Sequence, residues 1–204
     1  MLKVTNLECI RGEISLFKDV NFSVEPGELL QVNGPNGSGK TSLLRMLCGL
    51  TAPASGEIFW FNNNIRSLGE NYYNSIIYLG HLNGIKDNLN ALENLQILSG
   101  LVGNRIEENK AYSILQKMGL NGREMIPIKS LSQGQRRRVT LARLLVSNTV
   151  LWILDEPLVA LDASAVLLIK DILERHLKKG GMIVMTTHQD INISAIKIKR
   201  LQLN

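Results

Sequence analysis

The chain has 204 residues, of which 45% are hydrophobic and 20% are charged, and its net charge is +5. This length fits one domain, or one domain with a small inserted lobe. No apolar run approaches the ~20 residues that a membrane-spanning helix needs. The first residues alternate apolar and polar side chains, which predicts a strand and not a signal peptide. We therefore expect a cytosolic protein that reaches a membrane only through a partner.

The positive charge is mostly dispersed, apart from the runs Arg136–Arg138 and Lys197–Arg200. Aromatic residues make up only 5% of the chain, so no stacking platform for bases is visible and we expect no nucleic-acid partner. Cys9 and Cys48 lie in apolar segments and form no metal-ligand pattern. They are expected to be reduced core residues.

The first part of the chain predicts short strands around one helix. Alternation or apolar runs bounded by turn residues indicate the strands, and a 3.6-residue period that stops at Gly49 indicates the helix. The predicted strands are Met1–Glu8, Val20–Val24, Leu29–Val32 and Gly56–Phe61, and the helix begins at Lys40.

The middle of the chain, residues 82–147, has helical periodicity with few β-branched runs. Strands and a helix then alternate again, which favours a mainly parallel sheet. We predict one domain, with a core of residues 1–81 and 148–204 and an inserted helical lobe of residues 82–147. The helices are expected over Ala91–Leu101, Glu107–Met118, the segment after Ser132, and Ser164–Lys178; the strands are Val150–Leu154, Met182–Thr186 and an edge strand Ile196–Leu203.

A glycine-rich stretch between a predicted strand and a predicted helix matches the phosphate-binding P-loop. Its residues are Gly34-Pro35-Asn36-Gly37-Ser38-Gly39-Lys40-Thr41, followed by Ser42. Glycines let backbone N–H groups curl around phosphate oxygens, and the helix aims its positive N-terminus at them. We expect Lys40 to reach the β- and γ-phosphates of ATP and Thr41 to ligate Mg²⁺.

A second strand ends in two acids, Asp155 and Glu156. Such a strand end is a modest signal alone but a strong one behind a P-loop. Asp155 is expected to hold Mg²⁺, directly or through water, and Glu156 to polarise the water that attacks the γ-phosphate.

The segment Leu131-Ser132-Gln133-Gly134-Gln135-Arg136 resembles the signature motif of ABC transporter ATPases. From the residues alone, Ser132 is a good helix N-cap. The resemblance implies a P-loop NTPase of the ABC type: an α/β fold whose mainly parallel sheet carries an antiparallel β subdomain and a helical lobe. It also implies a homodimer on ATP binding, in which Ser132, Gly134 and Gln135 of one subunit contact the ATP held by the other.

Further positions follow the family's order. Ala160-Leu161-Asp162 resembles the D-loop, and His188 matches the switch histidine, which would contact the γ-phosphate. Two positions depart from the family: Arg11 falls near the usual adenine-stacking aromatic, and His81 near the usual Mg²⁺-sensing glutamine. Arg11 either stacks its guanidinium on the base or is an ordinary surface residue, and whether His81 replaces the glutamine is open.

These departures, with Gly56-Glu57-Ile58-Phe59-Trp60, Trp152 and the short C-terminus, look like the ATPase of the bacterial cytochrome c maturation haem exporter. That resemblance implies integral membrane partners, a peripheral location on the cytoplasmic face of the bacterial inner membrane, and haem not bound directly by this chain. The alternatives are the ATPase of another small ABC exporter and a soluble ABC ATPase of a cofactor-assembly system. The partner-facing surface is predicted at residues 81–95, unless the apolar residues there simply pack the lobe.

Overall fold

The computed structural model describes residues 1–101, 103–187, 191 and 196–204, so the predicted switch residue His188 lies outside the described part. The chain forms two compact units. The first unit contains residues 1–78, 149–156 and 174–204, and the second contains residues 79–148 and 157–173. Each unit is described below by itself.

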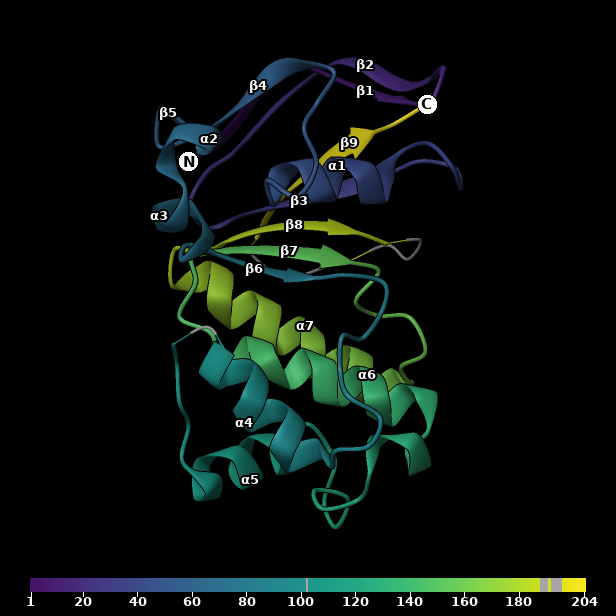
Figure 1. The fold of residues 1–204 in the computed structure, drawn as a ribbon, viewed down its shortest axis with the longest axis vertical. Coiled ribbons are helices and arrows are strands. Elements are labelled where there is room, and N and C mark those ends of the chain that lie inside the picture. Colours follow the sequence, from purple (N-terminus) through teal and green to yellow (C-terminus); the bar gives the residue numbers. More distant parts are fainter. Residues whose placement is uncertain (102, 188–190, 192–195) are drawn as a thin grey trace. The chain divides into compact units, whose positions relative to one another are not determined.

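The first unit begins with a sheet of antiparallel strands. β1 (Leu2–Arg11) pairs with β2 (Ile14–Val24) on one side and with β4 (Ser55–Trp60) on the other, and the sheet order is β2-β1-β4-β5, with β5 at Asn63–Asn64. The predicted antiparallel subdomain is confirmed (Figure 1). β2 begins at Ile14 and not at Val20, because it forms a hairpin with β1 in which Arg11 faces Ile14 across the turn.

The second sheet of this unit has the order β6-β7-β8-β3-β9. The pairs β3–β8, β3–β9 and β7–β8 are parallel, which confirms the mainly parallel sheet. β7 and β8 are buried along their whole length, as expected for strands covered on both faces. β9 lies at the edge, as predicted. The bounds are β3 Glu28–Asn33, β6 Ile76–Leu79, β7 Leu151–Asp155, β8 Met182–Thr186 and β9 Lys197–Gln202.

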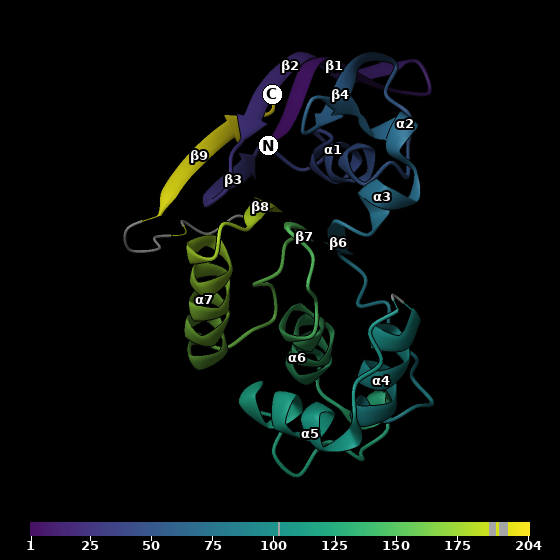
Figure 2. The same ribbon diagram turned by 90° about the vertical axis from the view of Figure 1, so that its left-hand side faces the viewer.

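Helix α1 (Lys40–Leu47) lies between the two sheets of the first unit (Figures 1 and 2). Its apolar side chains Leu43, Leu44 and Leu47 are fully buried in a core shared with both sheets. The helix therefore holds the phosphate loop, which immediately precedes it, against a rigid support. Cys9 and Cys48 are buried and unbridged, as expected.

Short elements that the sequence did not predict follow β4. They are α2 (Ile65–Leu68), α3 (Glu70–Tyr73) and the strand β6. Asn64 starts α2 by accepting a hydrogen bond from the Arg66 N–H at 3.0 Å. Tyr72 of α3 is buried and its hydroxyl donates to the Leu47 carbonyl at 2.5 Å, so this region is fixed to the end of α1.

The second unit is helical and contains the three helices predicted for the lobe. These are α4 (Ala91–Leu101), α5 (Glu108–Lys117) and α6 (Gln133–Ala142), with the 3₁₀ turns η1 (Ile128–Ser130) and η2 (Arg143–Leu145). The buried amide of Asn94 accepts from the Lys86 N–H at 2.7 Å and donates to the Lys86 carbonyl at 3.0 Å. One side chain on α4 thus fixes the preceding loop.

Helix α7 (Ala163–Lys178) contributes its first part to the second unit and its last part to the first. Near its end the His176 ring stacks on Trp152 of β7, with 3.7 Å between ring centroids and 10° between planes. Burial lowers the pKa of His176, and its Nε2 lies 3.1 Å from the Val150 carbonyl. The neutral imidazole is therefore part of the packing of this helix on the sheet.

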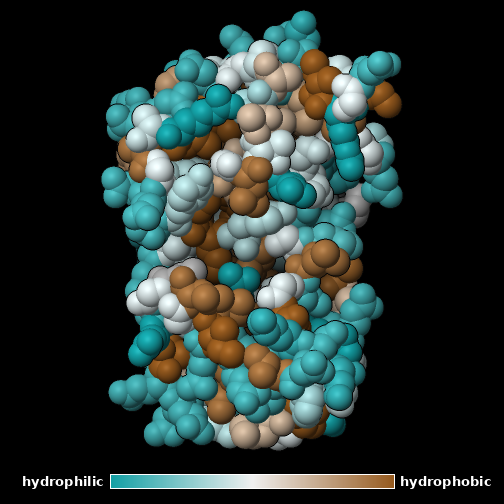
Figure 3. Space-filling model, viewed as in Figure 1, coloured by the Kyte–Doolittle hydropathy of each residue, from teal (hydrophilic) through white to brown (hydrophobic). Residues whose placement is uncertain are grey.

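Of the helices formed by the described residues, none combines the length and apolar character needed to span a bilayer. On the face seen in Figure 3, hydrophobic residues are interspersed with hydrophilic ones. Leu82 has the most exposed side chain among the large hydrophobic residues of the described segments, at 85%. The alternative to a partner-facing surface, that the apolar residues around position 82 simply pack the lobe, therefore does not hold for Leu82.

Two lysines of the edge strand β9, Lys197 and Lys199, form ion pairs with the buried Glu28 of β3. Burial tends to raise the pKa of Glu28, but hydrogen bonds from Lys197 and Lys199, at 2.7 and 2.6 Å, outweigh it and lower that pKa to about 2. A carboxyl group whose pKa is lower in the folded than in the unfolded protein stabilises the fold at pH values above its unfolded pKa. This stabilisation is lost as the pH falls toward 2.

We expect Glu28→Gln to lower the free energy of unfolding by about 1–3 kcal/mol at pH 7, measured by urea denaturation. The difference from the unsubstituted protein should shrink steadily between about pH 5 and pH 2. Glu174→Gln, which removes the exposed i,i+4 pair with Lys178, is the control and should change little. A constant Glu28→Gln deficit across this range would contradict the account.

Candidate active site of the first unit

The glycine-rich loop connects β3 to α1, as the sequence predicted. Gly34, Gly37 and Gly39 have positive φ angles of 153°, 87° and 92°, a backbone that side chains disfavour. A Cβ on Gly34 would lie 2.7 Å from the Leu203 carbonyl oxygen, and one on Gly39 would lie 2.9 Å from the Phe17 ring. The loop therefore favours glycine at all three positions for conformation, and at Gly34 and Gly39 also for space.

Two side chains of this loop are suited to an anion. The Lys40 ammonium donates to the Gly34 and Pro35 carbonyls at 2.7 and 2.9 Å, and an ammonium has a third donor to give. The Ser38 hydroxyl is buried and has no hydrogen-bond partner among the described residues. A buried hydroxyl without a partner is costly, and a phosphate oxygen at this loop would satisfy it.

A chain of hydrogen bonds joins the start of α1 to the ends of two neighbouring strands. The Thr41 hydroxyl donates to Asp155 Oδ2 at 2.8 Å, and the Thr186 hydroxyl donates to Asp155 Oδ1 at 2.7 Å. Asp155 and Thr186 face each other in the parallel register of β7 and β8, and both are almost fully buried. The carboxylate is thus held in one orientation by hydroxyls on both sides.

Thr186 was not predicted as a site residue. Its hydroxyl also accepts from the Glu156 N–H at 2.9 Å, so it contacts both acids at the end of β7. The sequence shows only a hydroxyl residue at the end of a predicted buried strand, and the register that places it opposite Asp155 is visible in the structure alone.

Glu156 has a φ of 47°, an uncommon value for a residue with a side chain. Such backbone conformations gather at functional sites, where the surroundings enforce them. Nearby, burial and then the charge of Asp155 raise the pKa of Tyr78 to about 12, so its phenol stays neutral. The strand end therefore presents a fixed Asp155 carboxylate beside a neutral tyrosine.

The donor set fits a small hard cation beside a phosphate. Thr41 and Asp155 offer a hydroxyl and a carboxylate, which Mg²⁺ accepts together with phosphate oxygens and water. No cluster of three or more His, Cys, Asp and Glu that could hold a metal occurs in the described ranges. A site of this kind would need the nucleotide to complete the coordination.

In the second unit, Ser132 is the N-cap of α6, as predicted. Its hydroxyl accepts from the Gln135 N–H at 3.2 Å, and the Gln135 side chain accepts from the Ser132 N–H at 2.9 Å. This capping box fixes the signature segment and uses the side-chain oxygen of Gln135. Gly134 lies in the first turn of the same helix.

Most of the remaining predicted residues are exposed. Arg11 is exposed at the hairpin end of β1, Asn36 is exposed at the tip of the phosphate loop, and Ser42 is half-buried in α1. His81 is exposed in the loop that follows β6.

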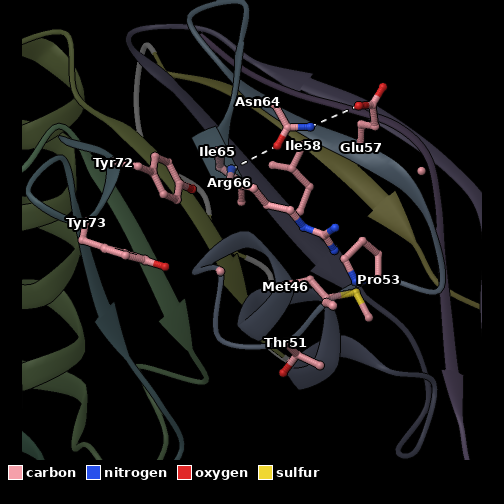
Figure 4. Close-up of a pocket in the computed structure, with 13 residues that line it drawn as sticks. Met46, Thr51, Pro53, Glu57, Ile58, Asn64, Ile65, Arg66, Tyr72 and Tyr73 are labelled. Carbon is pink, nitrogen blue, oxygen red and sulfur yellow. Dashed lines mark hydrogen bonds between the residues drawn. The ribbon is translucent and has the colours of Figure 1, made fainter. Parts of the chain in front are cut away.

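A surface hollow of about 160 Å³ lies near the other end of α1, away from the phosphate loop. Met46, Pro53, Ile58, Arg66 and Tyr73 are among the residues around it (Figure 4). The lining includes Asn64 and Glu57, which are hydrogen-bonded to each other at 3.1 Å. None of the described buried polar atoms without a partner lines this hollow.

The fold and the phosphate loop define an ATPase of the P-loop class. The family model described as "ABC transporter" matches residues 17–159 of the chain, a span that includes the phosphate loop, the signature segment and both strand-end acids. The chain therefore belongs to the ABC transporter family, as one of its ATP-binding ATPases.

Two similar proteins carry the same, specific name. The chain is 64% identical over 202 residues to the "Cytochrome c biogenesis ATP-binding export protein CcmA" of Nitrosospira multiformis, covering 99% of this chain and 98% of that protein. It is 60% identical to the protein of the same name from Nitrosomonas europaea, with 100% and 96% covered. The resemblance drawn from the sequence is confirmed by these names.

Solved structures agree on the fold. The dimeric bacterial ABC transporter cassette MJ0796 has a TM-score of 0.83 at 27% identity, covering 99% of this chain and 94% of that one. A dimeric form of MJ0796 in a post-hydrolysis state bound to ADP and Pi also has a TM-score of 0.83, at 26% identity, with 100% and 97% covered. A putative ABC transporter ATP-binding protein from Pyrococcus furiosus has a TM-score of 0.85 at 23% identity, covering 99% of this chain and 96% of that one.

We expect Thr186→Val to slow ATP turnover and to lower the free energy of unfolding by about 1–3 kcal/mol, because the Glu156 N–H and one Asp155 oxygen lose their partner. Steady-state phosphate release and urea denaturation would measure the two effects. Thr186→Ser keeps the hydroxyl and should restore most of the turnover. Normal turnover in the valine variant would show that Thr186 does not position the acids.

Proposed function

We propose that this chain is the ATPase subunit of an ABC exporter that serves cytochrome c biogenesis. The observation that supports it most is the Thr41–Asp155–Thr186 hydrogen-bond chain beside the phosphate loop, in a chain 64% identical to a protein named for that process. The hydrogen bonds argue for ATP chemistry, and the identity argues for the process that the chemistry drives.

In this proposal the residues of the first unit act on one MgATP. The backbone N–H groups from Asn36 to Gly39 cradle the phosphates, and Lys40 neutralises the β- and γ-phosphates. Mg²⁺, held by Thr41 and Asp155, supplies charge neutralisation at the phosphate oxygens. Glu156 orients and polarises the attacking water, while His188 is proposed to contact the γ-phosphate.

Two copies are proposed to enclose two ATP molecules head to tail, each supplying Ser132, Gly134 and Gln135 to the nucleotide of the other. The N-terminus of α6 suits this task, because the helix dipole favours an anion there and the capping box engages the N–H groups of Ser132 and Gln135 only with each other's side chains. The dimeric form of MJ0796 supports this arrangement by likeness of fold.

The partners are proposed to be integral membrane subunits, with the ATPase peripheral on the cytoplasmic face of the bacterial inner membrane. We propose no nucleic-acid partner and no direct haem contact for this chain. His81, beside β6, is proposed to occupy the position from which such ATPases sense Mg²⁺ and their membrane subunits.

Glu156→Gln tests the proposed chemistry. The amide is nearly isosteric with the carboxylate but cannot act as a base, so the variant should bind ATP normally and lose turnover by at least about a hundredfold. ATP-bound dimers should accumulate and be seen by gel filtration. Hydrolysis at the unsubstituted rate would mean that Glu156 is not the catalytic carboxylate.

Arg11 is proposed to stack on adenine from the hairpin end of β1. Arg11→Ala should then weaken ATP binding by about 0.5–2 kcal/mol and leave inorganic triphosphate binding unchanged, measured by calorimetry. An equal loss for both ligands would assign Arg11 to phosphate or to structure, and no loss would leave it a surface residue.

The docking surface for the membrane subunits is proposed at residues 81–95. Leu82 is 85% exposed there, whereas Ile85 and Leu89 are half-buried. Leu82→Asp should abolish co-purification with the membrane subunits while ATP binding by the isolated chain survives. Ile85→Asp should do the same if Ile85 also contacts the partner.

Intact co-purification of both variants would place the docking surface elsewhere. Failure of the unsubstituted chain to co-purify with any integral membrane protein would favour a soluble ABC ATPase of a cofactor-assembly system. Stimulation of turnover by haem in the presence of the partners would separate the cytochrome c role from another small exporter.

A further inference from the structure

In the second unit, the signature helix α6 contacts the turn Leu158–Asp162 at a position where no side chain fits. A Cβ on Gly134 would lie 2.7 Å from the Ala160 carbonyl oxygen, far closer than real Cβ contacts. Ala160 itself has a φ of 63°, which is unfavourable for a residue with a Cβ. The turn therefore packs closely against the first turn of α6. Its backbone conformation is unfavourable, so other contacts must stabilise it.

Arg138, one helical turn beyond Gly134, makes the second contact with this turn. Its guanidinium lies 2.5 Å from Asp162 Oδ2 and also donates to the Met118 carbonyl at 3.3 Å, so it is held at both ends. The Arg138 side chain is 16% exposed but that of Asp162 is 62% exposed, so solvent partly screens the ion pair and its effect is modest.

The other oxygen of Asp162 has a different task. Oδ1 accepts from the Ala165 N–H and from the Ser164 hydroxyl, both at 2.8 Å, and so caps the start of α7. One carboxylate therefore joins α6, through Arg138, to α7, through its cap. The exposed turn between these helices is fixed from both of its sides.

We propose that Arg138 is a positioning residue that holds the turn Leu158–Asp162 on helix α6, so that the turn and the signature segment form one rigid surface. This inference rests on the proposed function, in which the signature segment faces the nucleotide of a second copy. Without Arg138, the backbone at Ala160 would be free to leave its unfavourable φ. Dimer formation would then have to order the turn, and this entropic cost would weaken the dimer.

The test uses the full chain in the Glu156→Gln background, where ATP-bound dimers accumulate. Arg138→Met removes the guanidinium, and Asp162→Asn removes the charge but keeps an oxygen to cap α7. Each should raise the dimer dissociation constant about threefold to fivefold in analytical ultracentrifugation with MgATP. ATP binding by the monomer should be unchanged, because neither residue touches the phosphate loop.

The double variant Arg138→Met/Asp162→Asn should be no weaker than either single variant, since both remove the same interaction. Lys178→Met is the matched control, because it breaks a 2.5 Å ion pair with Glu174 elsewhere on α7 and should leave the dimer unaffected. If Arg138→Met does not fold, Asp162→Asn alone decides the result.

Additive effects of the two substitutions, or unchanged dimerisation in Asp162→Asn, would overturn the inference and leave the proposed function standing. An equal weakening by Lys178→Met would overturn it too, because the effect would not be specific to this pair. If the parent Glu156→Gln chain forms no ATP-dependent dimer, the proposed dimer fails first and the inference fails with it.

Discussion

The hydrogen-bond chain Thr41–Asp155–Thr186 is the constraint on which the active site depends. It requires that α1 begin where β7 and β8 end, and the parallel register of those strands provides this by placing Asp155 opposite Thr186. The buried core around α1 keeps the helix there, with Leu43, Leu44 and Leu47 fully buried. A buried carboxylate is tolerated because hydroxyls satisfy both of its oxygens.

The glycine loop and the acidic strand end favour ligands of opposite charge. The loop gathers backbone donors, the Lys40 ammonium and a buried Ser38 hydroxyl with no described partner, all of which favour an anion. The strand end gathers carboxylates that would repel that anion if no cation stood between them. A cation such as Mg²⁺ between them would reconcile the two halves of the site, which supports MgATP as the proposed ligand.

Much of this arrangement could be predicted from the sequence, because strands with periodic or continuous apolar residues position the chemistry. The phosphate loop, Asp155 and the Ser132 cap each follow from a local pattern and lie on the expected elements. Thr186 was missed because its importance comes from the register between β7 and β8, which no local pattern reveals. The start of β2 and the short helices α2 and α3 were missed for the same reason, since each depends on packing and not on period.

The central proposal is that Asp155, oriented by Thr41 and Thr186, would help to hold the Mg²⁺ that accompanies ATP. Calorimetric titration of ATP with and without Mg²⁺, for the unsubstituted chain and for Asp155→Asn, tests it most directly. The account predicts that Asp155→Asn binds metal-free ATP at least as tightly but loses the gain in affinity that Mg²⁺ confers. An undiminished Mg²⁺-dependent gain in Asp155→Asn would contradict it.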